Sequence, residues 1–472
     1  MSDIDGVETS KLYTNPRVMI IAIDALLIML GFGIVAPSMA FYLIALEGGL
    51  SQAPGPDYIV PDTVVAQFSL ILGVMMASFM GTRTLFARYF GGFSDEHGRK
   101  PTLVLGLVGY VVLLILFGLA QNWIHLLIIR SLQGVVSAMV WPVAEAALMD
   151  IVGIERRGEG LGLYMMVSNV GFILGPGVGG LLYNFCRDVL LLPVPDVFRV
   201  PYYIGALITL PAAILTLLIL KETAPGKVSE IADIEKDDIL PVPTPISSPS
   251  EYEPLSTKRS RMIKVIYIMS LTNGIAMGLG QPIFQLFLMS HITSDIGMIG
   301  LIISGAGAIG MLFSIPAGRV ADRRGRKGLA VWGAVGARVS LGALPLTTTL
   351  AGTSVVWVGQ SASMAVSQPA LRAIQADIVP WKLRGKLFGT IQAFFNAGAT
   401  IGPLAGGALY GIFSLMVFQL GPFLIGGYVI PFWLAASIGF FGALLLWLYV
   451  EETLSPSTKI IEVKEGTELD AT

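Results

Sequence analysis

The chain has 472 residues, of which 54% are hydrophobic and only 13% are charged. Soluble domains carry roughly a quarter charged residues, so this composition excludes an ordinary soluble protein. The net charge of −2 offers no basic surface for nucleic acid, and the single cysteine, Cys186, excludes an internal disulfide.

Apolar runs of about 20 residues recur along the chain, and each is long enough to cross the ~30 Å hydrocarbon layer as a helix. We therefore predict an all-α membrane protein with twelve transmembrane helices. The predicted segments, in chain order, are 17–46, 62–90, 101–120, 124–150, 158–185, 200–220, 262–290, 296–318, 328–348, 352–378, 384–415 and 422–450.

A segment of different composition, residues 221–261, divides the chain, because proline, serine and charged residues dominate it. We interpret it as a linker between an N-terminal six-helix bundle, 17–220, and a C-terminal six-helix bundle, 262–450. The remaining residues form an N-terminal tail, 1–16, and a C-terminal tail, 451–472.

Lysine and arginine are unevenly distributed between the predicted loops. If both termini lie inside, only Arg187 and Arg199 of the 30 Lys and Arg residues fall in outer loops. Because inner loops carry the positive excess, we predict a multi-pass protein of the cell membrane whose termini and linker are cytoplasmic.

The two halves are related by an internal repeat. The sequence GGFSDEHGRK at 91–100 matches GRVADRRGRK at 318–327, an offset of 227 residues. The same offset aligns Asp150 with Asp377 and Gly175-Pro176 with Gly402-Pro403. Since six helices is an even number, we expect parallel repeats about an axis along the membrane normal.

The repeated loop carries a known signature. It resembles the G-x-x-x-D-x-x-G-R-[KR] motif of the major facilitator superfamily, although Glu96 stands where the first copy usually has a base. The matching residues are Gly91, Asp95, Gly98 and Arg99, and, in the second copy, Gly318, Asp322 and Arg326. The resemblance implies the major facilitator fold, in which two pseudo-symmetric six-helix bundles enclose a central cavity.

The resemblance also implies a role for the charged loop residues. It places Asp95 at the start of helix 11, whose dipole favours negative charge, and pairs Arg99 with Asp150. The second set, supplied by the repeat, is Asp322, Arg326 and Asp377. We expect these networks to act as a conformational latch; the alternative is that the loop charges only set the topology.

The fifth predicted helix contains the sequence GFILGPGVGG. It resembles the G-x-x-x-G-P-x-x-G-G signature of antiporters in this superfamily, and LGFGIVAPSMAFYL in helix 1 is similar to a stretch of its drug:proton antiporters. The signature residues are Gly171, Gly175, Pro176, Gly179 and Gly180. The resemblance implies export by exchange, whereas the residues alone indicate close helix packing.

Ionisable residues within the predicted helices are candidates for proton coupling, because each charge near the bilayer centre costs roughly 2.5–3.5 kcal/mol. They are Asp24, Arg130, Glu145 and Arg372. Asp24 is interpreted either as a proton carrier or as an acid near the start of helix 1. Arg130, in a match to the R-x-x-Q-G motif, is expected to hold or expel the proton, or else to pair with a fixed acid.

Glu145 and Arg372 are also 227 residues apart, so the repeat places them at equivalent positions in helices 4 and 10. We expect them to approach when the cytoplasmic side closes; the alternative is that each is hydrated in the cavity mouth. Arg83 lies close enough to the loop to reach the cytoplasmic face, and Arg338 is left unassigned.

We predict a secondary active transporter, specifically a proton-coupled antiporter that exports a small lipophilic or amphiphilic compound by rocker-switch alternating access. A proton symporter or uniporter for a sugar, organic acid or other solute is the alternative, and a non-transporting membrane sensor is a third class. The expected partners are a small-molecule substrate, protons and the lipid bilayer. We expect a monomer with no enzymatic activity. We also expect no cofactor or metal, since no P-loop or metal-binding motif is present in the sequence.

Overall fold

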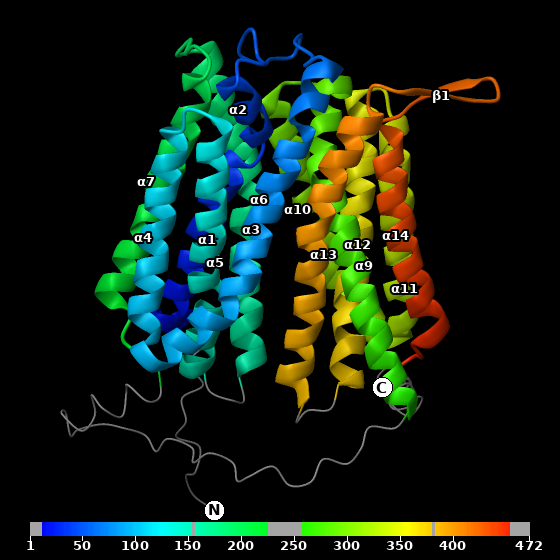
Figure 1. Cartoon of the computed structure of the whole chain (residues 1–472). Helices are drawn as coiled ribbons and strands as arrows, with labels where there is room; N and C mark the ends of the chain where they lie inside the picture. Colours follow the sequence, from blue (N-terminus) through cyan, green and yellow to red (C-terminus); the bar gives the residue numbers. More distant parts are fainter. Residues whose placement is uncertain (1–11, 153–155, 225–256, 380–382, 454–472) are drawn as a thin grey trace, which may run out of the picture. The chain divides into compact units, whose positions relative to one another are not determined.

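The structure, a computed structural model, describes residues 12–152, 156–224, 257–379 and 383–453 (Figure 1). Most of the predicted linker and of both predicted tails lies outside these residues. The described residues form long helices and one hairpin. The elements are η1 (Leu12–Thr14), α1 (Pro16–Val35), α2 (Met39–Leu46), α3 (Asp62–His97), α4 (Arg99–Gly118), α5 (Trp123–Val152), α6 (Arg157–Asp188), α7 (Asp196–Ile219), α9 (Thr257–Phe287), η2 (Leu288–Ile292), α10 (Ile296–Arg324), α11 (Arg326–Ala343), η3 (Leu344–Leu346), α12 (Leu350–Ile378), α13 (Arg384–Phe413), β1 (Val417–Leu420), β2 (Phe423–Gly426) and α14 (Val429–Tyr449).

Each of the twelve predicted segments is helical, but the first is divided. The α1 helix ends at Val35, and α2 starts again at Met39. Pro37 lies between them and has no backbone N–H to continue the helix. The Ser38 hydroxyl donates to the Val35 carbonyl at 3.1 Å, so it satisfies one of the acceptors that the break exposes.

The prediction that the last segment begins at residue 422 was wrong. Residues 417–426 form an antiparallel hairpin in which Val417 pairs with Gly426 and Leu420 pairs with Phe423. Gly421 adopts a φ of +62° at the turn, a conformation that glycine adopts readily. A short apolar run is compatible with either helix or strand, and here the glycine turn allows the strands, which Figure 1 shows beside the start of α14.

Ten helices in the described part of the chain are long and apolar enough to cross a membrane by length and composition. The helices α12 and α13 have 29 and 30 residues, so they also exceed the ~20 residues required. Their sequences contain more Ser, Gln, Asn and Gly, which lowers their hydropathy. Such residues are typical of helices that pack closely or face a polar interior rather than lipid.

Contacts divide the chain into two compact units. The first comprises residues 1–54, 78–250 and 296–301. In it, α1 packs against α6 and α7, and α4 packs against α5 and α7 (Figure 1). Its core includes Ile21, Leu107 and Val140, which are almost completely buried.

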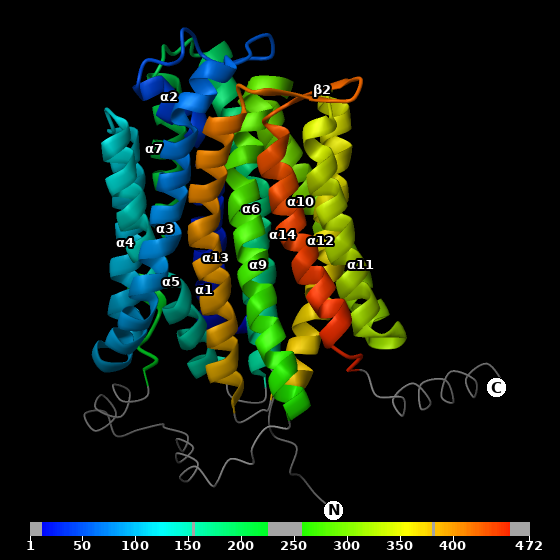
Figure 2. The ribbon, with the colours of Figure 1, turned by 45° about the vertical axis from the view of Figure 1, so that its right-hand side comes forward.

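The second unit comprises residues 55–77, 251–295 and 302–472. In it, α9 packs against α13 and α14, and α11 packs against α12 and α14 (Figure 2). Its core includes Ile266, Ala330 and Ile374. The pairs α1–α6 and α9–α13 occupy equivalent places in the sequence repeat, so the repeat is also a repeat of packing.

Candidate functional site

Each loop motif contains a turn that depends on glycine. Gly98, between α3 and α4, has a φ of 108°, and Gly325, between α10 and α11, has a φ of 116°. Residues with a β-carbon rarely adopt these values. The second glycine of each motif is therefore required for the backbone conformation of the turn. The next helix begins at the residue that follows it, Arg99 in the first copy and Arg326 in the second.

The first charge network centres on Arg99. Its Nε donates to Asp150 Oδ2 at 3.1 Å, and its Nη1 lies 2.5 Å from Asp95 Oδ1. The same Nη1 donates to the Ser94 hydroxyl at 2.9 Å. The structure thus brings together the three charged residues that the sequence analysis selected. Within its own unit Asp95 pairs with Arg99, and its expected contact with the start of the eleventh span stays a prediction.

The second network repeats this arrangement. Arg326 forms an ion pair with Asp377, the equivalent of Arg99 with Asp150. Arg259 of α9 adds to it, because its guanidinium donates to the carbonyls of Asp377 and Ile378 at 3.1 and 2.5 Å. The side chain of Asp322 lies outside the described part of the structure. Gly91 and Gly318, the first motif glycines, have no described neighbour within 4 Å of a β-carbon position.

Two glutamates that the sequence analysis missed complete these loops. Glu222 accepts hydrogen bonds from the backbone N–H groups of Arg99 and Lys100 at 2.8 and 3.2 Å. Glu452 accepts from those of Arg326 and Lys327 at 3.0 and 3.1 Å. Each carboxylate therefore caps the helix that follows a loop motif, where N–H groups lack intrahelical partners and the dipole favours negative charge.

A sequence signal for this pair does exist. Each glutamate is followed by threonine and lies two residues beyond the end of the sixth or the twelfth predicted segment, and the two glutamates are 230 residues apart. The loop motifs are 227 residues apart, so an alignment at that fixed offset does not match the two glutamates with each other.

The glycine-rich signature of α6 forms a seam with α1. A β-carbon on Gly175 would fall on the backbone of Gly33, and one on Gly33 would fall on the backbone of Gly175. Gly171 and Gly179 face the backbone of α1 at Leu26 and Ile34. Helix α6 continues through Pro176, and Gly180 faces the start of α10, which belongs to the same contact unit.

Asp24 is a buried carboxyl in the first unit. It is 7% exposed and lies among the apolar side chains of Ile21, Leu107 and Val140. The Thr216 hydroxyl of α7 donates to its Oδ2, whereas Oδ1 is buried and has no hydrogen-bond partner among the described residues. The adjoining cavity of about 10 Å³ is at the lower limit for a water molecule. An ionised carboxylate is costly in such a place.

Arg130 is held between two aromatic rings. Its guanidinium carbon lies 5.2 Å from the ring centre of Phe32 and 5.1 Å from that of Phe79, in the range of cation–π contacts. Nη1 donates to the Gln133 side chain at 2.5 Å, and no carboxylate pairs with it among the described residues. Phe32 is eight residues beyond Asp24 on α1, so Arg130 lies about 12 Å farther along that helix.

The other two candidates lie on different units and are described separately. Glu145 is half-buried on α5, and Arg372 is exposed on α12. Their pairing stays a prediction.

Arg338, which the sequence left unassigned, is 4% exposed in the second unit. It donates to Asn273 Oδ1 at 2.8 Å and packs on Gly439, where a β-carbon would overlap its guanidinium.

Comparison with known proteins identifies a family. The sequence model of the Major Facilitator Superfamily matches residues 21–262 and 266–468. An uncharacterized MFS-type transporter of Methanocaldococcus jannaschii is 24% identical over 405 residues, which cover 84% of this chain and 92% of that protein.

Two resistance proteins are also similar to this chain. The quinolone resistance protein NorA of Staphylococcus aureus is 22% identical over 302 residues, 64% of this chain and 66% of that protein. The multidrug resistance protein 1 of Bacillus subtilis is 32% identical over 173 residues, 36% of this chain and 42% of that protein. The chain thus spans less than two thirds of each.

Among solved structures, a D-xylose-proton symporter has a similar fold. It gives a TM-score of 0.68 at 14% identity, and the match covers 93% of this chain and 99% of that one. The same fold is seen in an inward-open xylose transporter from E. coli, with a TM-score of 0.63 at 15% identity over 94% of this chain and 98% of that one.

Proposed function

The chain belongs to the Major Facilitator Superfamily of membrane transporters, and from this premise we propose that it is a proton-coupled antiporter. It exports a small lipophilic or amphiphilic compound across the cell membrane by rocker-switch alternating access. It works as a monomer whose termini are both cytoplasmic.

The observation that carries this proposal is the position of Asp24. A carboxyl with one hydrogen-bond donor and one unpaired buried oxygen favours binding a proton over remaining charged in an apolar core. Thr216 can donate to either state, so it keeps the side chain in place while the proton comes and goes. Protonation changes the charge of the core of the first unit, which is what coupling to a conformational change requires.

Arg130 supports the same proposal. Its positive charge has no described carboxylate partner, and the two rings and Gln133 fix its position. A fixed cation about 12 Å farther along α1 attracts the negative charge of an ionised Asp24, and water screens this attraction only weakly in a buried site. We therefore assign to Arg130 the release of the proton from the carrier.

The α1–α6 seam and the two resistance proteins support export in particular. The backbones of Gly33 and Gly175 are in close contact, which is the close packing that the resemblance of this glycine signature to antiporters implies. The relatives from S. aureus and B. subtilis are named for quinolone and multidrug resistance, and export of lipophilic compounds is consistent with those names.

A proton carrier would serve a symporter equally well, so the test must determine the direction of coupling. Purified protein is reconstituted in vesicles, a pH gradient is imposed, and movement of the fluorescent lipophilic cation ethidium is measured. The proposal predicts that ethidium accumulates in the compartment that is more acidic, because it exchanges for protons. Accumulation in the same direction as the protons, or transport that ignores the gradient, would contradict it.

A further inference from the structure

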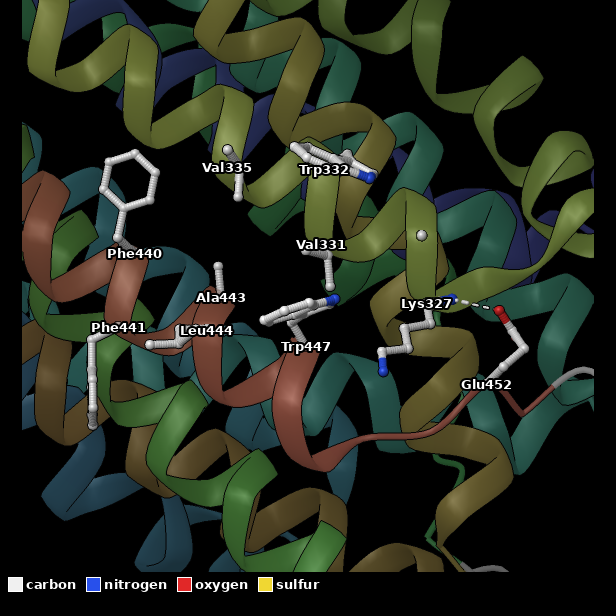
Figure 3. A pocket seen from close by; sticks show the side chains of 11 residues that line it. Lys327, Val331, Trp332, Val335, Phe440, Phe441, Ala443, Leu444, Trp447 and Glu452 are labelled. Carbon is white, nitrogen blue, oxygen red and sulfur yellow. Dashed lines mark hydrogen bonds between the residues drawn. The ribbon is translucent and has the colours of Figure 1, made fainter.

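An apolar groove runs along the exposed surface of the second unit between α11 and α14 (Figure 3). Its volume is about 790 Å³, which is within the range of small-molecule sites. Side chains of α11 form one wall and those of α14 form the other, with Trp332 and Trp447 on opposite walls. Trp332 is 75% exposed and Trp447 is 57% exposed, so the groove opens outward from the unit.

The length of the groove along the helices is close to the thickness of one membrane leaflet. Lys327, the second residue of α11, and Glu452, just beyond the end of α14, line one end of it. Val335 and Phe440 line the other end, and each is nine residues from the corresponding end of its helix. Nine residues span about 13 Å, and half of the ~30 Å hydrocarbon layer is about 15 Å. A single acyl chain therefore fits along the groove.

The end of the groove next to the loop motif is lined by the ammonium group of Lys327. Both carboxylate oxygens of Glu452 accept backbone N–H groups of α11, so its charge is offset by the positive end of that helix. The neighbouring Arg326 is paired with Asp377. In the described part of the chain, no acidic side chain pairs with Lys327 Nζ. A cation at the wet end of an apolar groove is complementary to a lipid with a negatively charged headgroup.

The side chains of Trp332 and Trp447 are also suited to contact with a lipid. Neither indole N–H donates to an acceptor among the described residues, so both remain available to phosphate or ester oxygens. Trp447 is two residues from the end of α14, at the depth where tryptophan is enriched in membrane proteins. An indole ring provides apolar contact area and a polar N–H on the same side chain.

We propose that this groove binds one anionic phospholipid of the leaflet that faces the loop motifs. One acyl chain lies between Trp332 and Trp447, and the headgroup phosphate pairs with Lys327 Nζ. The residues of this site belong to the second unit, whereas Asp24 and Arg130 belong to the first. A bound lipid would stabilise the packing of α11 on α14, and it would place a phosphate beside the second loop motif.

Tryptophan quenching tests this assignment directly. Variants of the full chain keep either Trp332 or Trp447 and have phenylalanine at the other six tryptophans. Each is titrated with phosphatidylglycerol or phosphatidylcholine that carries brominated acyl chains. We expect phosphatidylglycerol to reach half-maximal quenching at a lipid fraction about fivefold lower than phosphatidylcholine does. The attraction of one lysine to an anionic membrane surface, about 1 kcal/mol, corresponds to roughly this ratio. Lys327→Gln should abolish this preference while quenching persists, and Lys327→Arg should keep it.

A variant that keeps only Trp433 is the matched control. Its indole donates to the Gly342 carbonyl at 3.0 Å, and it lies outside the groove, so both lipids should quench it equally. Equal quenching of Trp332 by the two lipids, no quenching, or a preference that survives Lys327→Gln would overturn the proposal. Native mass spectrometry of the wild-type chain gives an independent readout: it should retain phosphatidylglycerol over phosphatidylcholine, and Lys327→Gln should not.

Discussion

Glu222 and Glu452 each connect the end of one half of the chain to the loop motif of that half. Glu222 also accepts the N–H groups of Thr223 and Ala224 at 2.8 and 2.9 Å, so one carboxylate organises four backbone donors. The resemblance predicted the pairing of Arg99 with Asp150, because the motif and its partner aspartate are both part of it, but it did not predict the pairing of Arg99 with Asp95. It did not predict Glu222, because a cap that joins residues 123 positions apart leaves no local pattern.

The Glu222 cap should contribute measurably to stability. Glu222→Ala leaves the first N–H groups of α4 without their acceptor, and loss of a helix cap costs about 1–2 kcal/mol. We expect a lower thermal midpoint of the purified protein. Glu159→Ala is the matched control, because Glu159 forms an exposed ion pair with Arg156 three residues away. Equal midpoints for the two variants would show that the cap has no structural role.

The latch hypothesis makes a second prediction for single residues. Asp95→Asn should greatly reduce transport in a protein that still folds and reaches the membrane, because Arg99 loses one of its two carboxylate partners. The equivalent Asp322→Asn should be at least as damaging, since the first motif copy already has Glu96 in place of a base. Transport assays at matched protein levels test both variants, and normal transport by Asp95→Asn would contradict the latch hypothesis.

Close helix packing can be predicted from the sequence where small residues recur at a regular spacing. The spacing of the glycines predicts a closely packed face on α6, since residues four apart lie on one face of a helix, whereas α1 as the partner helix was not predicted. The boundaries of the elements were harder to predict. The hairpin at residues 417–426 and the break at Pro37 both lie in apolar runs, where hydropathy does not distinguish helix, strand and turn.

The seam can be tested on a single helix. Gly175→Ala places a methyl group against the backbone of Gly33, and overpacking costs typically about 1–3 kcal/mol. Gly162→Ala, on the same helix, meets no described atom within 4 Å, and alanine is the better helix former. We expect Gly175→Ala to lower the thermal midpoint and Gly162→Ala to leave it unchanged or raise it. The opposite order would contradict a close-packed seam.

For the whole molecule, the repeat explains most of what the sequence predicted. Equivalent turns at Gly98 and Gly325, equivalent ion pairs and equivalent helix caps occur in the two halves. We propose that residues 17–220 and 262–450 form the two bundles and that residues 221–261 join them. The substrate could not be predicted, because the motifs that specify the fold are in the loops and seams rather than on a surface that recognises a solute.

Glu145 and Arg372 allow a test of how the two halves work together. If their charges attract one another when the cytoplasmic side closes, each single reversal should impair transport. The double change Glu145→Arg with Arg372→Glu should then restore part of it, although desolvation offsets some of the gain. A double variant no more active than the worse single variant would exclude pairing.

Coupling of a proton to transport by Asp24 can be tested with Asp24→Asn when two assays are compared in the same vesicles. Exchange of labelled for unlabelled substrate needs no net proton movement, whereas accumulation driven by a pH gradient does. If Asp24 carries the proton, Asp24→Asn retains exchange but loses gradient-driven accumulation, while Asp188→Asn, a change at an exposed acid of α6, retains both. Gradient-driven accumulation by Asp24→Asn at the wild-type level would contradict the account.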